Sequence, residues 1–415
     1  MLDRGLLRNE PDRVREASLN KGEPCPIDRW LLLDEERRDL LGRTESLRRR
    51  RNELSQEVSS LKKSGSQADT KIAESKKVGD SIGQIDKELS AVNREMAEVE
   101  LQFANIPDPD VPVGKDESFN KIIRTSGARP SFDFKPKPHW EILGSLFDQE
   151  SSGDIAGANF ILLRGWAACL QRKLINWMMD FHSEAGMEEI WTPFLANRES
   201  MTTSGQIPKL EYDMYHIEKD DLFLIPTGEV PLTNIYRNTT MNESVLPVSI
   251  VGYTPCFRRE AGSYGKDTRG LNRVHQFEKV EMVRFEHPDR SEEALEEMVS
   301  HVEKMLSLLE LPYRISVLST GDLSFAAAKC YDIEVWSAGQ EKWLEVSSIS
   351  NFRDFQSRRG KIRFKPLDGG KPQFVHTLNG SGLALPRIIA ALIENNQTEN
   401  GKVRFPSVIA VDPVV

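Results

Sequence analysis

Apolar positions divide the chain into two parts with different periods. Leucine recurs every seven residues from Leu33 to Leu61, and after the polar break SGSQAD apolar residues recur at steps of three and four from Ile82 to Val99. A heptad repeat places its apolar positions along one side of a helix. Two such helices joined by a short polar turn predict an antiparallel, coiled-coil hairpin over about residues 28–102. At 1.5 Å per residue, helices of roughly 30 residues make an arm of about 45–50 Å, too narrow to enclose a pocket.

After the arm, short β-rich runs alternate with helical runs. Three prolines and a glycine in residues 105–118 break all periodicity and predict a linker. Strands are predicted in DLFLIPTGEV, LPVSIVGYTPCFRRE, RVHQFEKVEMVRFE and KWLEVSSISNF, and helices in LINWMMDFHSEAG and LALPRIIAALIENNQ. Neighbouring strands that pair through hairpins, with helices around them, indicate an α+β fold on a mostly antiparallel β-sheet flanked by helices. The expected domains are 1–104 with the helical arm, a linker at 105–120, and 121–415.

Composition narrows the class of protein further. The chain has 415 residues with 39% apolar and 29% charged residues, and no run of about 18 apolar residues that would span a membrane. The charged N-terminus does not resemble a signal peptide, so we expect a cytoplasmic protein with no membrane partner. The four cysteines are far apart and lack metal-ligand spacing, so we expect reduced thiols and no zinc.

Charge is unevenly distributed along the predicted arm. Residues 35–65 carry nine Lys/Arg against six Asp/Glu, including the run Arg48, Arg49, Arg50 and Arg51, whereas residues 69–102 carry five against eight. One interpretation is the solvated surface of a coiled coil. The other is a phosphate-binding edge, because arginine forks match phosphate oxygens. The net charge of −9 argues against broad nucleic-acid binding but leaves room for a local basic surface.

The segment 253–285 reads as strand, loop and strand, with charged residues inside it. Side-chain alternation would place Arg258 and Glu260 on one face and Arg259 on the other, while Phe277, Lys279 and Glu281 share a face of the return strand. Arginine suits a phosphate, an aromatic ring suits a base, and a carboxylate suits an amine. A loop with Lys266 and Arg269 among glycines could close over polyphosphate. The alternative is a structural ion-pair network on a hairpin.

Three further segments offer groups of the same kind. The strand predicted in PTGEVPLTN would place Thr227 and Glu229 on one face and Gly228 on the other. LEVSSIS offers oxygen ligands suited to Mg²⁺, and NGSGLALPR predicts a tight glycine turn before a helix. The side chains concerned are Glu345, Ser347, Ser348, Ser381 and Arg387. No P-loop and no strand-flanked GxGxxG occurs, so any ATP site is of another type.

Taken together, FRREAGSYGKDTRGLNRVHQFEKVE, TGEVPLTN, EVSSISNFRDFQSRR and TLNGSGLALPR resemble the bacterial type of seryl-tRNA synthetase, a class II aminoacyl-tRNA synthetase. The resemblance extends over the whole chain, including the arm and the linker. It implies activation of L-serine with ATP to seryl-adenylate and transfer to the 3′ end of tRNA(Ser), with tRNA(Sec) as a further candidate. It also implies Mg²⁺, a homodimer with its interface near residues 174–193, and an arm that grips tRNA through Arg48–Arg51.

The resemblance assigns roles residue by residue. Arg258 would bind the α-phosphate, Glu260 the adenine amino group and Arg387 the γ-phosphate, while Glu345 and Ser348 would hold Mg²⁺. Phe277 would stack on the base and Val274 would contribute backbone contacts. Arg258, Glu345 and Arg387 are thereby the expected catalytic residues, and Arg259, Val346 and Ser347 fall within the ATP-binding segments. The expected serine-binding residues are Thr227, Gly228, Glu229, Arg258, Glu281 and Ser381.

Some positions depart from the family pattern or carry no role in it. Gly228 and Arg259 stand where relatives often have other small residues and serine, and both are expected to point away from the ligand. Asn159 stands where an arginine is frequent, which leaves local contacts there open. The chemistry needs no covalent nucleophile, so Cys256 and His275 are expected to be bystanders.

Two other functions remain to be weighed. The first is a ligase that activates a small amino acid and passes it to a carrier protein, which would lack the helical arm. The second is a non-enzymatic coiled-coil scaffold, which would be free to lose Arg258, Glu260, Glu345 or Arg387. The chain has the arm and all four residues, so both alternatives are disfavoured.

Overall fold

The computed structural model describes residues 1–261 and 269–409, and over these residues the chain divides into two compact units. The first, here called the arm unit, comprises Leu2–Leu19 and Glu23–Ala104. The second, the sheet unit, comprises Met1, Asn20–Gly22 and the chain from Asn105 onward. The prolines and glycine predicted as a linker therefore belong to the sheet unit.

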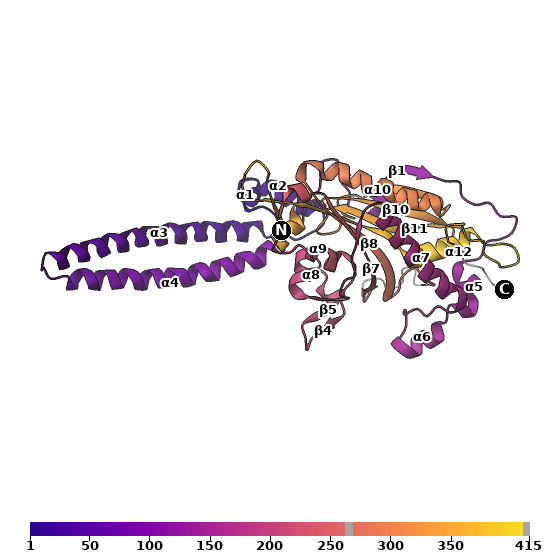
Figure 1. Cartoon of the computed structure of the whole chain (residues 1–415), viewed down its shortest axis with the longest axis horizontal. Coiled ribbons are helices and arrows are strands. Elements are labelled where there is room, and N and C mark those ends of the chain that lie inside the picture. The colour runs from indigo at the N-terminus through magenta and orange to yellow at the C-terminus, as the bar shows by residue number, and fades with distance from the viewer. Residues whose placement is uncertain (262–268, 410–415) are drawn as a thin grey trace. The chain divides into compact units, whose positions relative to one another are not determined.

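The arm unit is built from helices. They are α1 (Arg4–Asn9), α2 (Pro11–Asn20), α3 (Ile27–Lys63) and α4 (Asp69–Glu100). The two long helices lie side by side as an antiparallel hairpin, as predicted (Figure 1). With 37 residues and about 55 Å, α3 is longer than expected, whereas α4, with 32 residues and about 48 Å at 1.5 Å per residue, has the expected length. The heptad explains the pairing, since Leu33, Leu40 and Leu54 are buried against a face of α4 that carries Ile82, Ile85, Val92 and Met96.

Charged contacts fix the base of the hairpin. Trp30 Nε1 donates to Glu100 at 3.0 Å, and Arg4 Nε donates to the same carboxylate at 2.7 Å. Arg8 makes a bidentate pair with the buried Asp34, with both N–O distances at 2.7 Å. The hydrogen bond from Arg8 holds the pKa of Asp34 below its ordinary value. These pairs satisfy carboxylates that would be costly to bury alone.

Within the described residues, the sheet unit is organised on an eight-stranded sheet in the order β1-β9-β10-β11-β14-β8-β7-β2. Every neighbouring pair whose register is resolved is antiparallel except β2 with β7, which is parallel. The strands are β1 (Lys121–Ser126), β2 (Glu188–Glu189), β7 (Val248–Phe257), β8 (Gln276–Glu286), β9 (Tyr313–Val317), β10 (Lys329–Ser337), β11 (Lys342–Asn351) and β14 (His376–Ala384). The predicted α+β class with a mostly antiparallel sheet is confirmed.

Long helices cover one face of this sheet. The helices α7 (Gly165–Glu184), α10 (Ser291–Leu308) and α12 (Leu385–Asn395) pack on it and share one core with it (Figure 1). Strand alternation separates this core from the opposite face. On β8, Val280 and Met282 lie in the helix-covered core, while Lys279 and Glu281 line a cavity on the other side. The uncovered face therefore carries the candidate site.

Shorter elements complete the sheet unit. The short helices are α5 (His139–Leu143), α6 (Gln149–Ala156), α8 (Arg198–Ser204), α9 (Glu229–Asn234) and α11 (Phe355–Gly360). Two smaller sheets have three strands each among the described residues. One has the strand order β13 (Gln373–Phe374), β12 (Arg363–Lys365), β6 (Thr240–Asn242), and the other has the order β3 (Leu195–Asn197), β5 (Leu222–Leu224), β4 (His216–Ile217). The 3-10 turns are Glu117–Phe119, Gly144–Leu146, Glu211–Asp213, Glu243–Val245 and Pro288–Arg290. None of the helices in the described ranges is both long and apolar enough to cross a membrane.

Two local predictions are wrong. A strand was predicted through PTGEVPLTN, residues 226–234. The strand β5 instead ends before this segment, at Leu224, and the helix α9 begins within it, at Glu229. The glycine turn predicted around Ser381 is part of β14, which pairs with β8 on one side and β11 on the other. At Ser381 pairing with distant strands decides the conformation over the local glycine signal, whereas α9 is a helix that packs against α8 and β8.

Candidate active site

A cavity of about 560 Å³ opens on the sheet face that the long helices leave uncovered. Its wall comes from β8, β11 and β14, from the start of α12, and from the segments that follow β5 and β7. Most of the predicted site residues meet here although they are far apart in sequence. They are Thr227, Glu229, Arg258, Glu260, Val274, Phe277, Glu281, Glu345, Ser348, Ser381 and Arg387.

An arginine lies against an aromatic ring in one part of the cavity. The guanidinium carbon of Arg258 lies 5.1 Å from the centroid of the Phe277 ring, and Arg258 Nε donates to the carbonyl of Pro226 at 3.2 Å. The backbone N–H of Arg258 donates to the carbonyl of His275 at 2.9 Å, so β7 and β8 remain joined at this end. The fixed cation of Arg258 can bind a phosphate, and the neighbouring ring of Phe277 can stack on a base.

Arg259 is separated from this site, but not by strand alternation. β7 ends at Phe257, and Glu260 has a positive φ of 52°, so the strand predicted through these residues is wrong. Arg258 and Glu260 line the cavity, whereas Arg259 is exposed outside its lining. The backbone N–H of Arg259 donates to the carbonyl of Asp213 at 3.1 Å. Arg259 therefore faces away from the cavity, as expected.

An acidic pocket lies at the other end of the cavity. Glu229 and Glu281 are both buried, and Lys279 on β8 makes an ion pair with Glu281. Thr227 Oγ1 donates to Glu281 at 3.2 Å and accepts from Lys279 Nζ at 2.8 Å. Two carboxylates against one lysine leave the pocket an excess of negative charge when both are ionised. Such a pocket favours an ammonium group.

The protonation of Glu229 is sensitive to this environment. Burial, followed by the neighbouring Glu281 charge, raises the pKa of Glu229 to about 7. Gln356 Nε2 donates to Glu229 Oε1 at 2.5 Å, which favours the ionised form and partly opposes the shift. Glu229 can therefore exchange a proton near neutral pH, and a cation bound in the pocket would favour its charged form.

Gly228 packs beside this pocket. A Cβ at this position would be 2.9 Å from Glu281 Cβ and 3.2 Å from Thr254 Oγ1. The expectation that this position points away from the ligand stays a prediction. Gly228 itself is outside the lining of the cavity, but its lack of a side chain lets Glu281 approach.

Three residues of the pocket were missed as site residues in the sequence. Lys279, Gln356 and Asn379 are all buried there, with Gln356 Oε1 accepting from Thr377 Oγ1 at 2.7 Å. Asn379 lines the cavity beside Glu229. Lys279 shares a strand face with Phe277 and Glu281, which was a usable signal. Gln356 lies on α11, inside the quoted motif EVSSISNFRDFQSRR, but its uncharged side chain was given no role there.

A β-bulge brings Glu345 and Ser348 to the same wall. Residues three apart on a regular strand face opposite sides. In β11 the register shifts, so that Ser347 pairs with Ile333 and Glu345 with Glu334, and Val346 has no partner of its own. The extra residue restores the alignment, and both Glu345 and Ser348 line the cavity.

The other two residues of this stretch point elsewhere. Val346 packs in the helix-covered core, and Ser347 is buried with its hydroxyl donating to the carbonyl of Ser381 at 2.6 Å. Their side chains lie outside the cavity lining. Ser347 instead ties β11 to the strand that carries Ser381.

Arg387 completes the wall from the first turn of α12. Its Nη1 donates to the backbone carbonyl of Glu345 at 2.8 Å and lies 3.2 Å from the Glu345 carboxylate. Its Nε donates to the carbonyl of Asn272 at 3.4 Å. Arg387 is thus held between β11 and the segment that leads into β8, with its guanidinium at the cavity.

Cys256 and His275 lie beside the site without facing a ligand. Cys256 is fully buried, and burial raises the pKa of its thiol, which is the wrong direction for a nucleophile. His275 Nδ1 donates to the carbonyl of Arg258 at 3.1 Å, and its backbone N–H donates to the carbonyl of Asn159 at 2.9 Å. Asn159, the position that departs from the family pattern, thus contributes its backbone.

Other predicted groups lie elsewhere or outside the described residues. On the arm unit, Arg50 is tied to Glu74 at 2.7 Å, whereas Arg48, Arg49 and Arg51 are exposed. Lys266, predicted to close over polyphosphate, falls in 262–268, outside the described residues. In the described part of the chain, no group of three or more His, Cys, Asp or Glu residues is arranged to hold a metal ion.

Comparison with known proteins follows the same division of the chain. The N-terminal domain of seryl-tRNA synthetases matches residues 1–107, and the core domain of class II tRNA synthetases for Gly, His, Pro, Ser and Thr matches residues 212–396. A serine–tRNA ligase from Thermomicrobium roseum is 49% identical over 412 residues, covering 99% of this chain and 92% of that protein. The chain belongs to the serine–tRNA ligase family. Another member, from Geobacter sulfurreducens, is 50% identical over 99% of this chain and 97% of its own length.

Solved structures of the family agree with the fold. The seryl-tRNA synthetase from Pyrococcus horikoshii, complexed with ATP, matches with a TM-score of 0.93 at 36% identity over 99% of this chain and 97% of that chain. The cytoplasmic serine–tRNA ligase from Naegleria fowleri, in complex with AMP, matches with a TM-score of 0.88 at 28% identity over 99% and 96%. The predicted family and the class II fold are confirmed.

Proposed function

We propose that this protein is a serine–tRNA ligase that activates L-serine with ATP and transfers it to tRNA(Ser). The observation that carries the proposal is the joining, in one cavity, of the Arg258–Phe277 pair with the acidic pocket of Glu229 and Glu281. A nucleotide can bind at the first and an amino acid at the second, so the carboxylate of the amino acid can meet the α-phosphate between them. Membership of the serine–tRNA ligase family supports this assignment.

The chemistry divides into two transfers. In the first, an oxygen of the serine carboxylate attacks the α-phosphorus of ATP, and pyrophosphate leaves with the bonding electrons. In the second, a hydroxyl of the 3′-terminal adenosine of tRNA attacks the acyl carbon, and AMP leaves. Both steps depend on alignment and on neutralising developing charge, so the protein needs no covalent nucleophile.

The nucleotide half uses the groups around Arg258. Arg258 neutralises the α-phosphate, Phe277 stacks on the adenine, and Glu260 accepts from the adenine amino group. Val274 is buried at the same wall, where its backbone can contact the base. Arg387, held on the Glu345 and Asn272 carbonyls, binds the γ-phosphate.

Glu345 and Ser348 are the residues that would hold Mg²⁺. The β11 bulge presents a carboxylate and a hydroxyl oxygen on one wall, and Mg²⁺ takes oxygen ligands of this kind alongside substrate phosphates. The residues therefore fit the ion. When bound, Mg²⁺ supplies positive charge to the phosphates, which Arg258 and Arg387 reinforce.

The amino-acid half uses the acidic pocket. Glu229 and Glu281 attract the α-ammonium group, and Thr227 and Ser381 offer hydroxyl groups at the lining. A pocket built to hydrogen-bond a hydroxyl group leaves polar atoms unpaired with alanine, which opposes its binding. Lys279 fixes Thr227 and Glu281 in place, so these groups are oriented before the substrate arrives.

The arm unit has a separate role. We propose that its exposed arginines contact the tRNA backbone, with tRNA(Ser) as the partner and tRNA(Sec) as a second candidate, in the cytoplasm. The arm argues against a ligase that loads a carrier protein. A coiled-coil scaffold would not need the assembled cavity.

The direct test is ATP–pyrophosphate exchange with serine, threonine, alanine and glycine in parallel. We expect serine to support exchange at least about a hundredfold better than alanine, since alanine leaves pocket groups unpaired. A folded protein that exchanges with none of them would overturn the proposal. A protein that exchanges but charges no tRNA would favour the carrier-protein ligase.

A further inference from the structure

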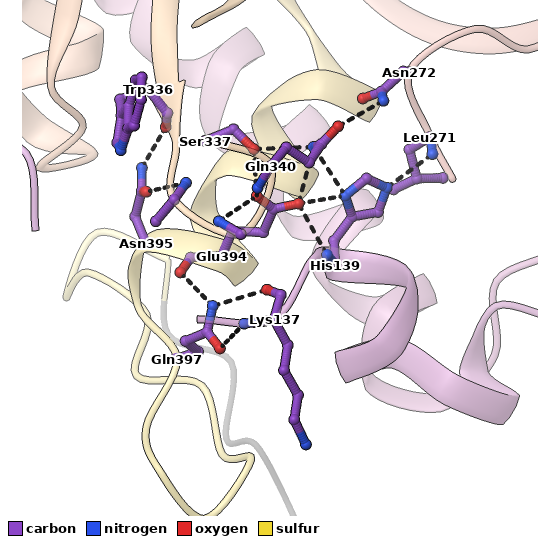
Figure 2. Close-up of polar contacts among 12 residues, drawn as sticks. Lys137, His139, Leu271, Asn272, Trp336, Ser337, Gln340, Glu394, Asn395 and Gln397 are labelled. Atoms are coloured by element: carbon purple, nitrogen blue, oxygen red, sulfur yellow. Dashed lines mark hydrogen bonds and ion pairs between the residues drawn. The ribbon is translucent and has the colours of Figure 1, made fainter. Parts of the chain in front are cut away.

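A buried hydrogen-bond network lies behind the cavity wall, between the start of α5 and the end of α12 (Figure 2). Glu394 has no exposed surface. Its Oε1 accepts from the backbone N–H and from Nδ1 of His139, at 2.9 and 2.7 Å, and from Gln340 Nε2 at 2.9 Å. Its Oε2 accepts from the Ser337 hydroxyl and from the backbone N–H groups of Gly339 and Gln340, the latter two at 3.0 and 3.2 Å.

These hydrogen bonds determine the charge of Glu394. Burial alone raises the pKa of its carboxyl, but the hydrogen bonds from His139 and Ser337 outweigh burial and keep the pKa below the ordinary value. The carboxylate is therefore ionised and saturated with donors. We call His139, Gln340 and Glu394 the clamp.

One end of the clamp holds the backbone of Leu271. His139 Nε2 accepts the Leu271 N–H at 2.9 Å. A backbone N–H can only donate, so Nε2 carries no proton and the proton lies on Nδ1, where it is donated to Glu394. Gly270 makes this approach possible, since it has φ +68° and a Cβ there would lie 2.2 Å from His139 Nε2.

The other end of the clamp holds the side chain of Asn272. Gln340 Nε2 donates to Glu394, which turns its Oε1 toward Asn272 Nδ2 at 2.8 Å. Asn272 is 8% exposed and lines the cavity, whereas no clamp residue does. Two successive residues of the cavity wall, Leu271 and Asn272, are thus fixed by groups outside the cavity.

Asn272 links the clamp to the nucleotide half of the site. Its carbonyl accepts from Arg387 Nε at 3.4 Å. Arg387 and Glu394 lie on the same helix, α12, two turns apart, so the helix that offers the phosphate ligand also carries the centre of the clamp. Displacement of Asn272 would remove one of the supports that orient the Arg387 guanidinium.

We propose that the clamp is a positioning device for ATP, which holds Leu271 and Asn272 so that Arg387 is aimed at the γ-phosphate. The inference rests on the function proposed above. Because the clamp does not touch the serine pocket, its loss should weaken the use of ATP and leave the use of serine intact. A merely structural role would instead lower the amount of active enzyme with both KM values unchanged.

Gln340→Met is the variant to measure, because Gln340 is only partly buried, whereas His139 and Glu394 are fully buried and their replacement threatens folding. The side chains are similar in size, and methionine lacks the amide. In pyrophosphate exchange by the full chain, corrected for active sites, we expect the KM for ATP to rise about tenfold and the KM for serine to stay within about twofold. An unchanged KM for ATP, or an equal rise in both, would overturn the inference.

Gln397→Met is the matched control. Gln397 is 6% exposed, and its amide group donates to the carbonyls of Lys137 at 2.9 Å and Glu394 at 2.8 Å. These hydrogen bonds go to neither Leu271 nor Asn272, and they support the same end of α12 (Figure 2). We expect a lower melting temperature without a change in the KM for ATP. A tenfold rise here as well would assign the effect to α12 stability and overturn the clamp.

A double-mutant cycle shows whether Gln340 acts through Asn272. If it does, Asn272→Ala combined with Gln340→Met raises the KM for ATP no further than the larger single effect. Effects that multiply would overturn this route. Arg387→Ala separates the two proposals: if it impairs ATP use while Gln340→Met does not, only the clamp fails, and if neither impairs it, the assigned role of Arg387 fails as well.

Discussion

Glu229 shows how burial turns an ordinary carboxyl into a pH-dependent binding group. Its pKa is raised to about 7 by burial and by Glu281, so it gains a proton as the pH falls through neutrality. The serine ammonium becomes only more fully protonated in the same direction. Any weakening of serine binding at lower pH must therefore come from the protein.

We expect the KM for serine to rise about tenfold as the pH falls from about 8 to about 6, because only the fraction with ionised Glu229 binds the ammonium group well. Steady-state pyrophosphate exchange across this range measures it. Glu229→Gln should have a high KM for serine that no longer depends on pH. A slope that survives in Glu229→Gln would assign the titration to another group.

Arg258 and Arg259 form a matched pair at adjacent positions. Arg258→Glu places a negative charge where the α-phosphate binds, so serine activation should fall at least about a hundredfold. Arg259→Ser should change it less than about threefold, because the exposed side chain lies outside the cavity and serine retains the N–H bonded to Asp213. Pyrophosphate exchange on folded variants decides between them. Equal losses would mean that Arg259 also reaches the nucleotide.

At the residue scale, the charged groups of the site could be predicted from the sequence. The uncharged residues that hold them in place could not. An arginine and a glutamate next to strand-like segments stand out, because burying charge needs a partner. Gln356 and Gln340 carry no charge that would draw attention to them. In the sequence, a glutamine on the surface cannot be told from a glutamine in a buried hydrogen-bond network. Their roles depend on partners that are 127 and 54 residues away, Glu229 and Glu394.

At the scale of elements, the arm hairpin was the most predictable part of the fold. A heptad is a local pattern, and its consequence, a pairing helix, needs no distant information. The segment 226–234 was less tractable. It was expected to be a strand, but only the packing of α9 makes it a helix from Glu229.

The arm also separates exposed arginines from paired ones. Arg50 makes ion pairs with Glu74, Glu53 and Glu57, so its charge is partly balanced. Arg49 and Arg51 are exposed and make no ion pair within the described residues. Free arginine forks bind phosphates, and each phosphate contact adds to the salt dependence of binding.

We expect Arg49→Glu combined with Arg51→Glu to lower kcat/KM for tRNA charging about tenfold or more and to reduce the slope of log K against log salt by roughly two. Pyrophosphate exchange should be unchanged. The control is Lys371→Glu, which reverses an exposed charge on the sheet unit. Loss of exchange together with charging would refute the separation of tRNA binding from activation.

At the scale of the whole molecule, the sheet unit leaves an apolar surface at one sheet edge. Trp191 is 76% exposed two residues after β2, which lies at the edge of the sheet, and its ring centroid lies 6.2 Å from that of Tyr253. An exposed tryptophan beside other aromatic rings is typical of a protein interface. We therefore propose that this edge forms the homodimer contact predicted near residues 174–193.

Light scattering after size exclusion should give twice the mass of the chain. Trp191→Glu should shift the protein to the monomer mass, because a buried unpaired charge opposes association. Leu367→Glu is the matched control, since Leu367 is 69% exposed and lies far from this edge in sequence. A wild-type monomer would count against the dimer, and a dimeric Trp191→Glu would place the contact elsewhere.

Periodicity and charge in the chain were enough to predict the antiparallel arm and the α+β sheet, whereas the grouping of the site residues rested on the resemblance to seryl-tRNA synthetases. Both patterns are found within short stretches of sequence, and they indicate which face of a helix or strand is buried. The bulge at Val346, the positive φ of Glu260 and the helix at 229–234 were decided only by tertiary structure. The same holds for the clamp, in which His139 meets Glu394 across 255 residues, because such contacts arise from strand pairing and packing that no local pattern contains. The sequence alone thus indicated that Arg258 and Glu260 belong to a binding site. Only the folded chain shows how the clamp holds Leu271 and Asn272 beside them.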